Sequence, residues 1–195
     1  MLLFHSIISR ATSIDIGDAT VRLISTKDVA AITAYYQRNR AFLQPWEPLR
    51  EEAFFTETGW HRRLEQLMQL HKHKMAYYFV IQQKGSDEIC GVVNYSNLVR
   101  HPFHACHVGY SLDQDCQGQG LMSRSLAAAN CWMFEDQSFH RIMAAYMPRN
   151  AKSAAVLKKC GFVIEGEAKD YLLINGKWED HILTACINED WTMPV

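Results

Sequence analysis

The sequence predicts a mixed α/β domain built on a largely antiparallel sheet, for three reasons. Short segments alternate between apolar and polar residues, longer segments repeat their apolar residues every three to four positions, and Asn175-Gly176 separates two alternating runs. The order is strand, two helices, three strands, helix, strand, helix and two strands. This order holds one strand–helix–strand crossover and lacks a Rossmann alternation, so we expect a twisted sheet of about seven strands with four helices.

The first predicted elements are a strand and a helix near the start of the chain. Residues 20–25 alternate as a strand does, and Ser25 or Thr26 is placed to cap a helix over residues 27–39. One face of this helix carries the apolar residues Val29, Ile32 and Tyr36. The segment therefore predicts an amphipathic helix that packs on the sheet.

Two prolines interrupt the next segment before a second helix begins. Pro45 and Pro48 predict a loop or a corner between helices over residues 41–52. Residues 59–73 then keep helical spacing. Their apolar stripe consists of Trp60, Leu64, Leu67 and His71. We interpret the end of this helix, residues 71–74, as solvated cations that complement the helix dipole.

Three strands are predicted in the middle of the chain. Residues 75–83 and 88–99 read as a hairpin, with glycine in its turn at residues 84–87. Residues 104–113 alternate as a third strand. One face of that strand carries His107, Gly109 and Ser111.

The last third of the chain predicts two helices and three strands. A helix follows the glycine-rich turn and repeats Met122, Leu126, Ala129 and Met133 on one face. Residues 140–147 are apolar on both faces, which favours a central strand covered on both sides. Residues 150–161 form a short helix with Gly161 as its C-cap, and residues 168–187 form two strands around the Asn-Gly turn.

Composition limits the classes of function that this chain can have. Its 195 residues are 48% hydrophobic and 21% charged, which is typical of one globular domain, residues 1–195 with a core over 20–187. A formal net charge of -1 gives no basic field for direct nucleic-acid binding. No run approaches the roughly 18 apolar residues of a membrane span, and residues 1–8 lack the features of a signal peptide. The six cysteines are scattered, so we expect a reduced cytoplasmic protein.

The most informative motif is the turn Gln117-Gly118-Gln119-Gly120, directly before a predicted helix. The first turn of a helix leaves backbone N–H groups unpaired and carries partial positive charge, so it can hold an anion. Glycine lets a phosphate approach that backbone. The lysine and hydroxyl of a P-loop are missing, which argues against a nucleoside triphosphate. The motif alone is equally compatible with a simple tight turn.

A second group of residues gives this turn a family context. Asn150, Ser153 and the pair Gly161-Phe162 follow about thirty residues later, and the two groups together resemble the acetyl-CoA-binding motifs of GCN5-related N-acetyltransferases (GNAT) over residues 21–187. The stretches FLQPWEP, GYSLDQDCQGQGLM, HRIMAAYMPRN and GEAKDYLLINGKWEDHILTA, with the closing DWT, are similar to the RimJ type of bacterial ribosomal-protein-alanine N-acetyltransferases. The resemblance implies the GNAT fold, acetyl-CoA as cosubstrate without a metal, and acetylation of the N-terminal alanine of a ribosomal protein.

The resemblance also implies where acetyl-CoA binds. The backbone of residues 117–122 would hold the pyrophosphate, and residues 109–112 would splay from a neighbouring strand and bind the pantetheine arm. Asn150 and Ser153 would line its acetyl end. The implied cofactor-binding residues are Gly109, Tyr110, Ser111, Leu112, Gln117, Gly118, Gln119, Gly120, Leu121, Met122, Asn150 and Ser153. Asp115 stands where the family usually has Gln or Arg, and it is not included because a carboxylate repels phosphate.

The reaction needs a deprotonated amine, and three candidates for the base remain open. A protein α-amine has a pKa of roughly 7.7–8, so a base that acts through water suffices. His107 occupies the strand position where many GNAT enzymes have glutamate. Glu47 stands beside Trp46 in the proline-framed loop, where it can also bind an ammonium group. Asp170 and Tyr171 could orient the substrate from a late strand.

The general acid is the other open question. Many family members have a tyrosine four residues before the Gly-Phe pair, whereas this chain has Leu157 there, so Ser153 is the nearest replacement. A backbone N–H near residues 109–111 would stabilise the oxyanion. The candidate catalytic residues are His107, Ser153, Asn150, Glu47 and Asp170. The candidate substrate-binding residues are Trp46, Glu47 and Tyr171.

Three other interpretations are weighed against this one. His101, His104 and His107 are three residues apart, a spacing that would bring their rings together on a helix. The segment instead alternates as a strand, which separates the rings, so no metal site is predicted. A small amine such as a polyamine or an antibiotic is an alternative acceptor. A non-catalytic acyl-CoA-binding or ribosome-assembly module is the third, because Leu157 removes the usual acid.

Overall fold

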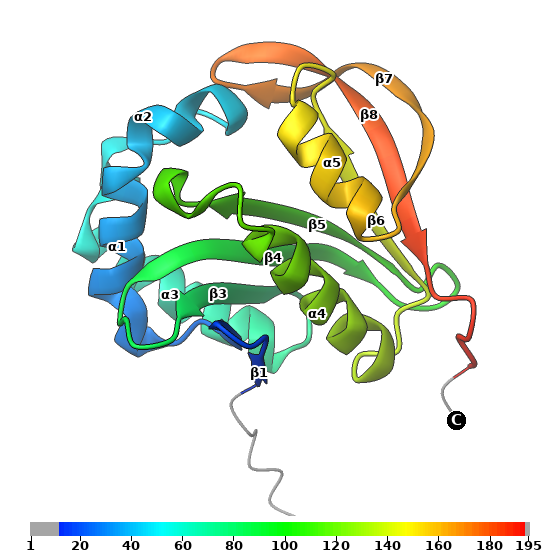
Figure 1. Cartoon of the computed structure of the whole chain (residues 1–195), viewed down its shortest axis with the longest axis horizontal. Helices are drawn as coiled ribbons and strands as arrows, with labels where there is room; N and C mark the ends of the chain where they lie inside the picture. Colours follow the sequence, from blue (N-terminus) through cyan, green and yellow to red (C-terminus); the bar gives the residue numbers. More distant parts are fainter. Residues whose placement is uncertain (1–11, 194–195) are drawn as a thin grey trace, which may run out of the picture.

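The computed structural model describes residues 12–193 and shows an eight-stranded mixed sheet with helices on both faces (Figure 1). The strands are β1 (Ser13–Asp15), β2 (Ala19–Leu23), β3 (Tyr77–Gln83), β4 (Ile89–Val99), β5 (Ala105–Leu112), β6 (Arg141–Tyr146), β7 (Val163–Ile174) and β8 (Lys177–Ile187). The α-helices are α1 (Val29–Arg38), α2 (Arg40–Leu43), α3 (Glu57–Lys72), α4 (Leu121–Glu135) and α5 (Ala151–Lys159). Residues 1–8, which we did not interpret as a signal peptide, lie outside the described part of the chain.

The predicted fold class is confirmed, with small additions. The strand order is β1-β2-β3-β4-β5-β6-β8-β7, and every neighbouring pair is antiparallel except β5 with β6. Strand β1 was not predicted because its three residues are too few to show alternation. Helix α2 is a single turn inside the proline-framed corner. None of the helices in residues 12–193 is long and apolar enough to cross a membrane.

Local signals account for several element boundaries. Ser25 and Asp28 form a capping box: the Ser25 hydroxyl accepts a backbone hydrogen bond, and Asp28 accepts one from the Ser25 N–H at 2.7 Å. At the other end of the chain, Asn175 and Gly176 have φ of 45° and 79°, and they join β7 to β8 in a tight hairpin. Both features follow from the residue types alone.

Two apolar clusters lie on opposite faces of the sheet. Helices α4 and α5 pack on one face, over a cluster that includes Phe79, Tyr95, Leu126 and Leu157. Helices α1 and α3 pack on the other face, over a cluster that includes Tyr35, Trp60 and Val80. The predicted helix stripes therefore point into the core on both sides.

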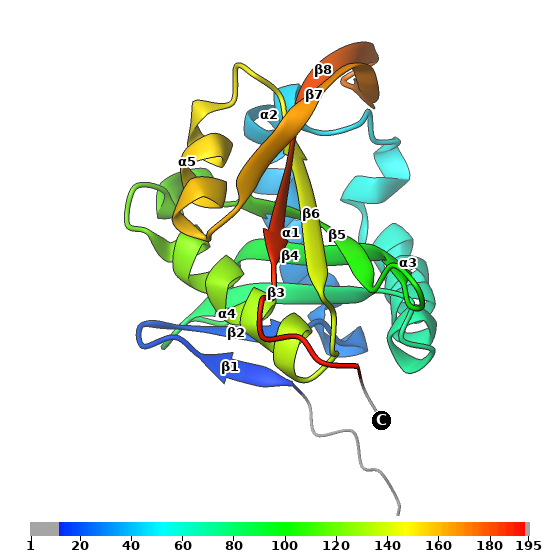
Figure 2. The ribbon, with the colours of Figure 1, turned by 90° about the vertical axis from the view of Figure 1, so that its right-hand side faces the viewer.

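The sheet divides between β5 and β6, and this division creates the central feature of the fold. The two strands are paired only over Ala105–His107, opposite Arg141–Met143. Beyond His107, β5 stays paired with β4 up to Leu112, but no strand of residues 12–193 pairs with its other edge. Figure 2 shows β6 and β8 rising steeply away from β5. An open edge with free backbone groups thus leads from the fork toward the glycine-rich turn.

The prediction that residues 140–147 form a strand covered on both sides is wrong. Ile142 and Ala144 are buried under α5, whereas Met143 and Ala145 are only half-buried. The reason is that α1 and α3 pack against β4 and β3, whereas the helix that packs on β6 is α5, on the opposite face of the sheet. This half-open face lies beside the fork.

The interpretation of residues 71–74 as solvated cations is also wrong for His71. Its Nε2 atom accepts a hydrogen bond from the Tyr78 N–H at 3.0 Å, and its ring stacks on Tyr77. Burial lowers the pKa of His71 from 6.5 to about 4. The ring is therefore neutral at pH 7 and serves as an acceptor that ties α3 to β3.

We expect this histidine to make stability depend on pH. Its pKa is lower in the folded chain than in the unfolded chain, so the unfolded state binds more protons as the pH falls from about 6.5 toward 4. The free energy of unfolding should fall by about 2 kcal/mol over this window. Urea titrations at pH 7.0 and 4.5 test the expectation. The His71→Gln variant should lose most of this pH dependence, and His73→Gln, an exposed control, should retain it. The assignment would be contradicted if the free energy of unfolding fell equally between pH 7.0 and 4.5 in both variants.

Candidate active site

The glycine-rich turn exposes the backbone at the start of α4. Gly118 and Gly120 have φ of 79° and 71°, a left-handed conformation that side chains other than glycine disfavour. Gly120 occupies the N-cap position of α4 without any side-chain hydrogen bond to the helix. A Cβ atom on Gly118 would meet no other atom within 4 Å. The N–H groups of the first turn therefore remain accessible to an anion from outside.

Two cations flank this turn. The Arg124 guanidinium donates to the Gln119 carbonyl at 3.0 Å and pairs with Asp18 at 2.7 Å. Lys152 Nζ donates to the Gln117 side-chain oxygen at 2.6 Å. The two side chains contact the residues on either side of Gly118, so positive charge lies next to the exposed backbone of the turn.

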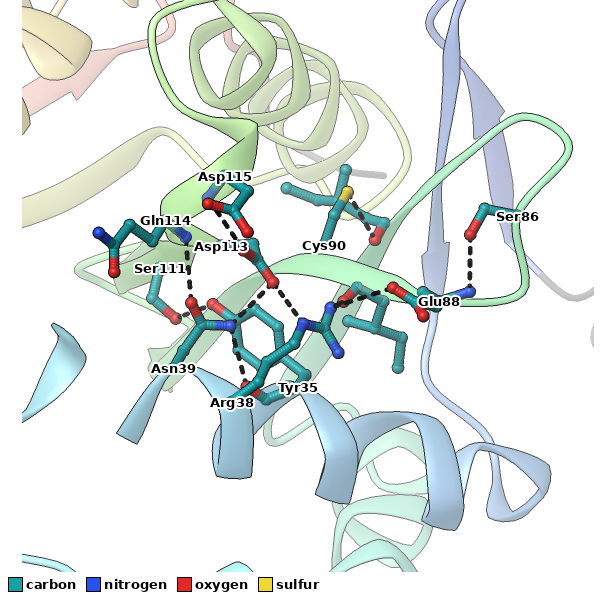
Figure 3. A network of polar contacts seen from close by, with 12 residues as sticks. Tyr35, Arg38, Asn39, Ser86, Glu88, Cys90, Ser111, Asp113, Gln114 and Asp115 are labelled. Carbon is teal, nitrogen blue, oxygen red and sulfur yellow. Dashed lines mark hydrogen bonds and ion pairs between the residues drawn. The ribbon is translucent and has the colours of Figure 1, made fainter. Parts of the chain in front are cut away.

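A polar network anchors the loop that leads into the turn (Figure 3). The Asp113 carboxylate accepts hydrogen bonds from Arg38 Nε at 2.6 Å and from Asn39 Nδ2 at 2.9 Å. Asn39 Oδ1 in turn accepts from the Gln114 N–H at 3.0 Å. The Asp115 N–H donates to Asp113 Oδ1 at 3.0 Å, while the Asp115 side chain is exposed. The C-terminal end of α1 thereby holds the β5–α4 loop in place.

The charge of Asp113 is stabilised in this network. Burial acts to raise the pKa of Asp113, but the hydrogen bonds from Asn39, from the backbone and from Arg38 outweigh it, so the pKa lies below its usual value. The carboxylate side chain is 7% exposed, and that of Arg38 is 34% exposed. Asp113 is therefore largely buried, and the loss of its charge leaves Arg38 with only a longer ion pair to Glu88 at 3.9 Å.

We expect Asp113→Asn to lower the free energy of unfolding by about 2 kcal/mol, because Arg38 loses the nearer and more buried of its two charged partners. Affinity for acetyl-CoA should also fall several-fold, since the loop before Gly118 is no longer anchored. Urea unfolding and calorimetric titration with CoA measure the two effects. Asp115→Asn removes the same charge from the exposed neighbouring position and should change stability by less than about 0.5 kcal/mol. Equal effects of the two substitutions would show that the network carries no special weight.

The open edge of β5 brings together residues that are far apart in the sequence. The Tyr110 hydroxyl lies 2.8 Å from Ser153 Oγ, and the Tyr35 hydroxyl lies 2.8 Å from Ser111 Oγ. Asn150 Oδ1 caps α5 by accepting the Ser153 N–H at 3.0 Å. Burial raises the pKa of Tyr110 well above its ordinary value, so its hydroxyl stays protonated. Ser153 therefore lies beside the β5 edge, and a protonated hydroxyl contacts it.

His107 lies at the fork itself. It is the last residue of β5 that pairs with β6, opposite Met143, and it faces Ser96 on β4. The ring is half-buried, and its Nδ1 atom has no hydrogen-bond partner among residues 12–193. Burial lowers the pKa of His107, so the imidazole is neutral near pH 7.

Glu47 is a carboxyl group held in a largely buried position. Its side chain is 19% exposed and lies 3.4 Å from Arg50, and its carbonyl oxygen accepts the Asn175 N–H at 2.9 Å. Burial raises the pKa of Glu47 above its ordinary value, although Arg50 and Arg63 act in the opposite direction. Its negative charge also contributes to the raised pKa of Tyr35, whose hydroxyl contacts Ser111 on the β5 edge. Glu47 is therefore near enough to the residues of the β5 edge for its charge to affect them.

Arg149 joins the Glu47 loop to the β7–β8 hairpin. Its guanidinium lies over the Trp46 ring at 5.4 Å, donates to the Pro45 carbonyl at 3.2 Å and pairs with Glu179 at 3.0 Å. These contacts hold Trp46 beside the hairpin. The sequence did not identify Arg149, because its partners lie about thirty and one hundred residues away.

Two of the remaining predicted residues lie on the hairpin. Asp170 is exposed at an irregularity of β7, where its φ is 44°, and its N–H donates to Asp180. The Tyr171 ring lies 5.6 Å from the His181 ring and is partly exposed. Neither residue makes a recorded contact with Glu47, His107 or Ser153 among residues 12–193, so the structure does not bring Asp170 into the group at the fork.

Other sequence candidates have different positions. Leu157 is 1% exposed and belongs to the core under α5, which leaves Ser153 as the hydroxyl of that helix near the β5 edge. Residues 12–193 contain no group of three or more His, Cys, Asp or Glu side chains arranged for a metal. A hollow of about 500 Å³ lies behind α4, between Asn130, Cys186 and Trp191, away from the fork.

Several residues of this site were missed by reasoning from the sequence. Tyr35, Arg38 and Asn39 lie on or beside α1, and their partners Ser111 and Asp113 follow more than seventy residues later. Asp113 alone had a local signal, since an aspartate directly after a strand often caps the next turn. The others could be found only from the fold.

Comparisons with known proteins agree with this geometry. A family model described as the acetyltransferase (GNAT) domain matches residues 18–163. The [ribosomal protein uS5]-alanine N-acetyltransferase of Escherichia coli (strain K12) is 49% identical over 172 residues, which cover 88% of this chain and 89% of that protein.

Solved structures give the same result. The ribosomal-protein-S5-alanine acetyltransferase from Vibrio fischeri is 56% identical, with a TM-score of 0.91 over 93% of this chain and 100% of that chain. Mycobacterium smegmatis RimJ, solved in complex with a CoA-disulfide, is 28% identical, with a TM-score of 0.84 over 92% of this chain and 88% of that chain.

Proposed function

The chain belongs to the GNAT acetyltransferase family, and we propose that it transfers the acetyl group of acetyl-CoA to the α-amine of an N-terminal alanine on a ribosomal protein. One observation carries the acetyl transfer: the unpaired edge of β5 runs from the fork at His107 to an uncapped helix N-terminus opened by Gly118. The relatives that acetylate alanine of uS5 support the choice of acceptor.

The site fits acetyl-CoA in each of its parts. The backbone of residues 117–122 would bind the pyrophosphate, with Arg124 and Lys152 at the rim. The free edge of residues 109–112 would bind the pantetheine arm as an added strand binds. Asn150 and Ser153 would lie at its acetyl end, beside Tyr110.

Acetyl-CoA supplies the thioester, and residues of this chain supply the proton transfers. Glu47 would bind the substrate ammonium and take one proton from it, so that the neutral amine can attack the thioester carbonyl, since its raised pKa brings it closer to that of an amine. The second N–H proton, lost as the C–S bond breaks and the amide forms, would pass to solvent and replace the proton that the thiolate receives. A backbone N–H near Gly109–Ser111 would hold the developing oxyanion. Ser153 would give a proton to the departing thiolate, and a thiol pKa of about 8.5 lets water replace it.

Trp46 and Tyr171 would form opposite walls around the acceptor, joined through Arg149 and Glu179. His107, a neutral imidazole at the fork, would line the site as an acceptor of hydrogen bonds. Asp170, exposed on the hairpin, would act on the substrate only from outside this group. We further propose that residues 1–195 form one catalytic domain that works in the cytoplasm without direct nucleic-acid binding.

Mass spectrometry of short peptides tests the proposed reaction. Peptides that begin with Ala, Ser or Met are incubated with the protein and acetyl-CoA, together with a lysine peptide whose N-terminus is blocked. We expect the gain of one acetyl group on the alanine peptide and none on the blocked control. Acetylation of polyamines without acetylation of peptides would assign a small-amine acceptor. CoA binding without any transfer would assign a non-catalytic module.

A further inference from the structure

A second hollow lies beside Glu47, and arginines dominate its lining. It has a volume of about 310 Å³, and its lining includes Arg50, Arg62 and Arg63 with a single acidic residue, Glu51. We call it the arginine hollow. Arg62 and Arg63 form no ion pair within residues 12–193, whereas Arg50 pairs with Glu47, a carboxyl group whose pKa both Arg50 and Arg63 act to lower. Three arginines thus share this region with two carboxyl groups, Glu47 and Glu51, which leaves a net positive charge that an external anion can complement.

Aromatic side chains hold this cluster in place. The Arg50 guanidinium lies 4.6 Å from the Phe54 ring centroid, and Arg63 lies 5.4 Å from Phe54 and 5.6 Å from Trp60. Trp60 also lines the hollow and is 1% exposed, and its Nε1 atom is buried without a hydrogen-bond partner in residues 12–193. The hollow thus combines Arg50 and Arg63, which lie over aromatic rings, with the exposed Arg62, and guanidinium groups are donors that bind a carboxylate.

The position of the hollow links it to the acceptor. Arg50 lines the hollow and also lies 3.4 Å from Glu47, so a single side chain separates the two places. An extended peptide advances about 3.3 Å per residue, so a chain whose α-amine lies at Glu47 reaches the hollow within a few residues. The positively charged N-terminus of such a peptide would then bind Glu47, and a negatively charged side chain a few residues later would bind the arginines.

We infer that the arginine hollow binds an acidic side chain of the acceptor, located between its second and fifth residues, and so selects N-terminal segments that carry Asp or Glu there. This inference rests on the proposed acetylation of a protein N-terminus. The carboxylate would accept hydrogen bonds from Arg62 and Arg63, and it would draw Arg50 away from Glu47. Glu47 would then be free to bind the substrate ammonium.

A peptide series tests the inference. Eight-residue peptides begin with alanine and otherwise contain serine and glycine, with one glutamate moved through positions two to five. Each has a counterpart with glutamine at the same position. We expect kcat/KM to be about tenfold higher for glutamate at one or two positions, mainly through KM, because the arginines do not touch the reacting atoms. The preference should weaken at high salt.

Matched variants locate the preference. The double variant Arg62→Gln/Arg63→Gln should reduce the glutamate-to-glutamine ratio to near one. Lys72→Gln removes a positive charge from an exposed position of the same helix and should preserve the ratio. A ratio near one at every position of the wild-type protein would overturn the inference and leave alanine acetylation intact. A ratio that persists in the double variant would also overturn it.

Binding measurements separate this inference from the proposed function. If no peptide is acetylated, the proposed reaction is wrong. Calorimetry of the same peptides with the CoA-saturated protein still gives the ratio of the dissociation constants of the glutamate and glutamine peptides, which tests the hollow by itself. Inorganic phosphate provides the probe for a free anion. If millimolar phosphate competes with the glutamate peptides but not with the glutamine peptides, the two anions share one site, which supports the inference. Phosphate binding without any peptide preference would show that the hollow takes a free anion and would overturn the inference.

Discussion

The Gly118→Glu variant is expected to lose at least about a hundredfold in affinity for acetyl-CoA, which corresponds to about 2.7 kcal/mol. Gly118 lies in the turn before α4, where its φ of 79° aims the backbone outward and no atom lies within 4 Å of a Cβ. A glutamate side chain would project into the space assigned to the pyrophosphate. It would block the N–H groups sterically and place a negative charge beside the phosphates.

The fold should survive this substitution, because the site is open and the strain of a left-handed residue costs only about 1–2 kcal/mol. Gly85→Glu is a matched control: Gly85 has a φ of 80°, is exposed in the turn between β3 and β4, and has no atom within 4 Å of a Cβ, so backbone strain and charge change in the same way. Calorimetry with CoA and thermal unfolding measure both properties. An unchanged dissociation constant in Gly118→Glu would place the phosphate site elsewhere.

The Glu47→Gln variant is expected to lose about a hundredfold in kcat at pH 7 while it keeps its affinity for CoA. The substitution retains the shape of the side chain but removes the group that takes the proton from the substrate ammonium. Burial raises the pKa of Glu47, so the wild-type carboxylate still accepts protons efficiently below the pKa of the amine. The variant depends on amine that is already deprotonated in solution.

The pH dependence gives this prediction its sign. A protein α-amine has a pKa of roughly 7.7–8, so kcat/KM of Glu47→Gln should fall about tenfold for each pH unit below 8. The wild-type enzyme should fall more gently until Glu47 itself becomes protonated. The defect should therefore be largest near pH 6.5 and smallest near pH 9. Glu189→Gln, at an exposed position after β8, should behave as the wild type. A similar loss at every pH would assign Glu47 a binding role only, and a loss confined to His107→Ala would transfer the base to that residue.

Much of the fold could be predicted because its signals are local. The stripe of Trp60, Leu64 and Leu67 faces the core, and the Asn175-Gly176 turn joins two strands. Each of these signals lies within one turn or one helix, where side-chain period and backbone preference act directly. The central strand over residues 140–147 was assigned the wrong environment because an apolar run does not show whether one face or both are covered.

The candidate site could be predicted only in the part that one segment contains. Gly118 and Gly120 have a local conformational requirement, and the helix that follows makes the phosphate interpretation possible. Glu47 was one of three bases, and no pattern distinguished it from His107 or Asp170. Its burial beside Arg50 results from the contact between its loop and the β7–β8 hairpin.

The sequence by itself thus determined the fold class, the family resemblance and the glycine turn, because residue type restricts φ, ψ and side-chain period within a few neighbouring positions. The tertiary structure alone decided where β5 parts from β6, how Arg38 reaches Asp113, and which carboxyl group is buried beside Arg50. Those outcomes join segments more than thirty residues apart, or depend on which faces the helices cover. Only the packing of the whole chain fixes such distances and burials.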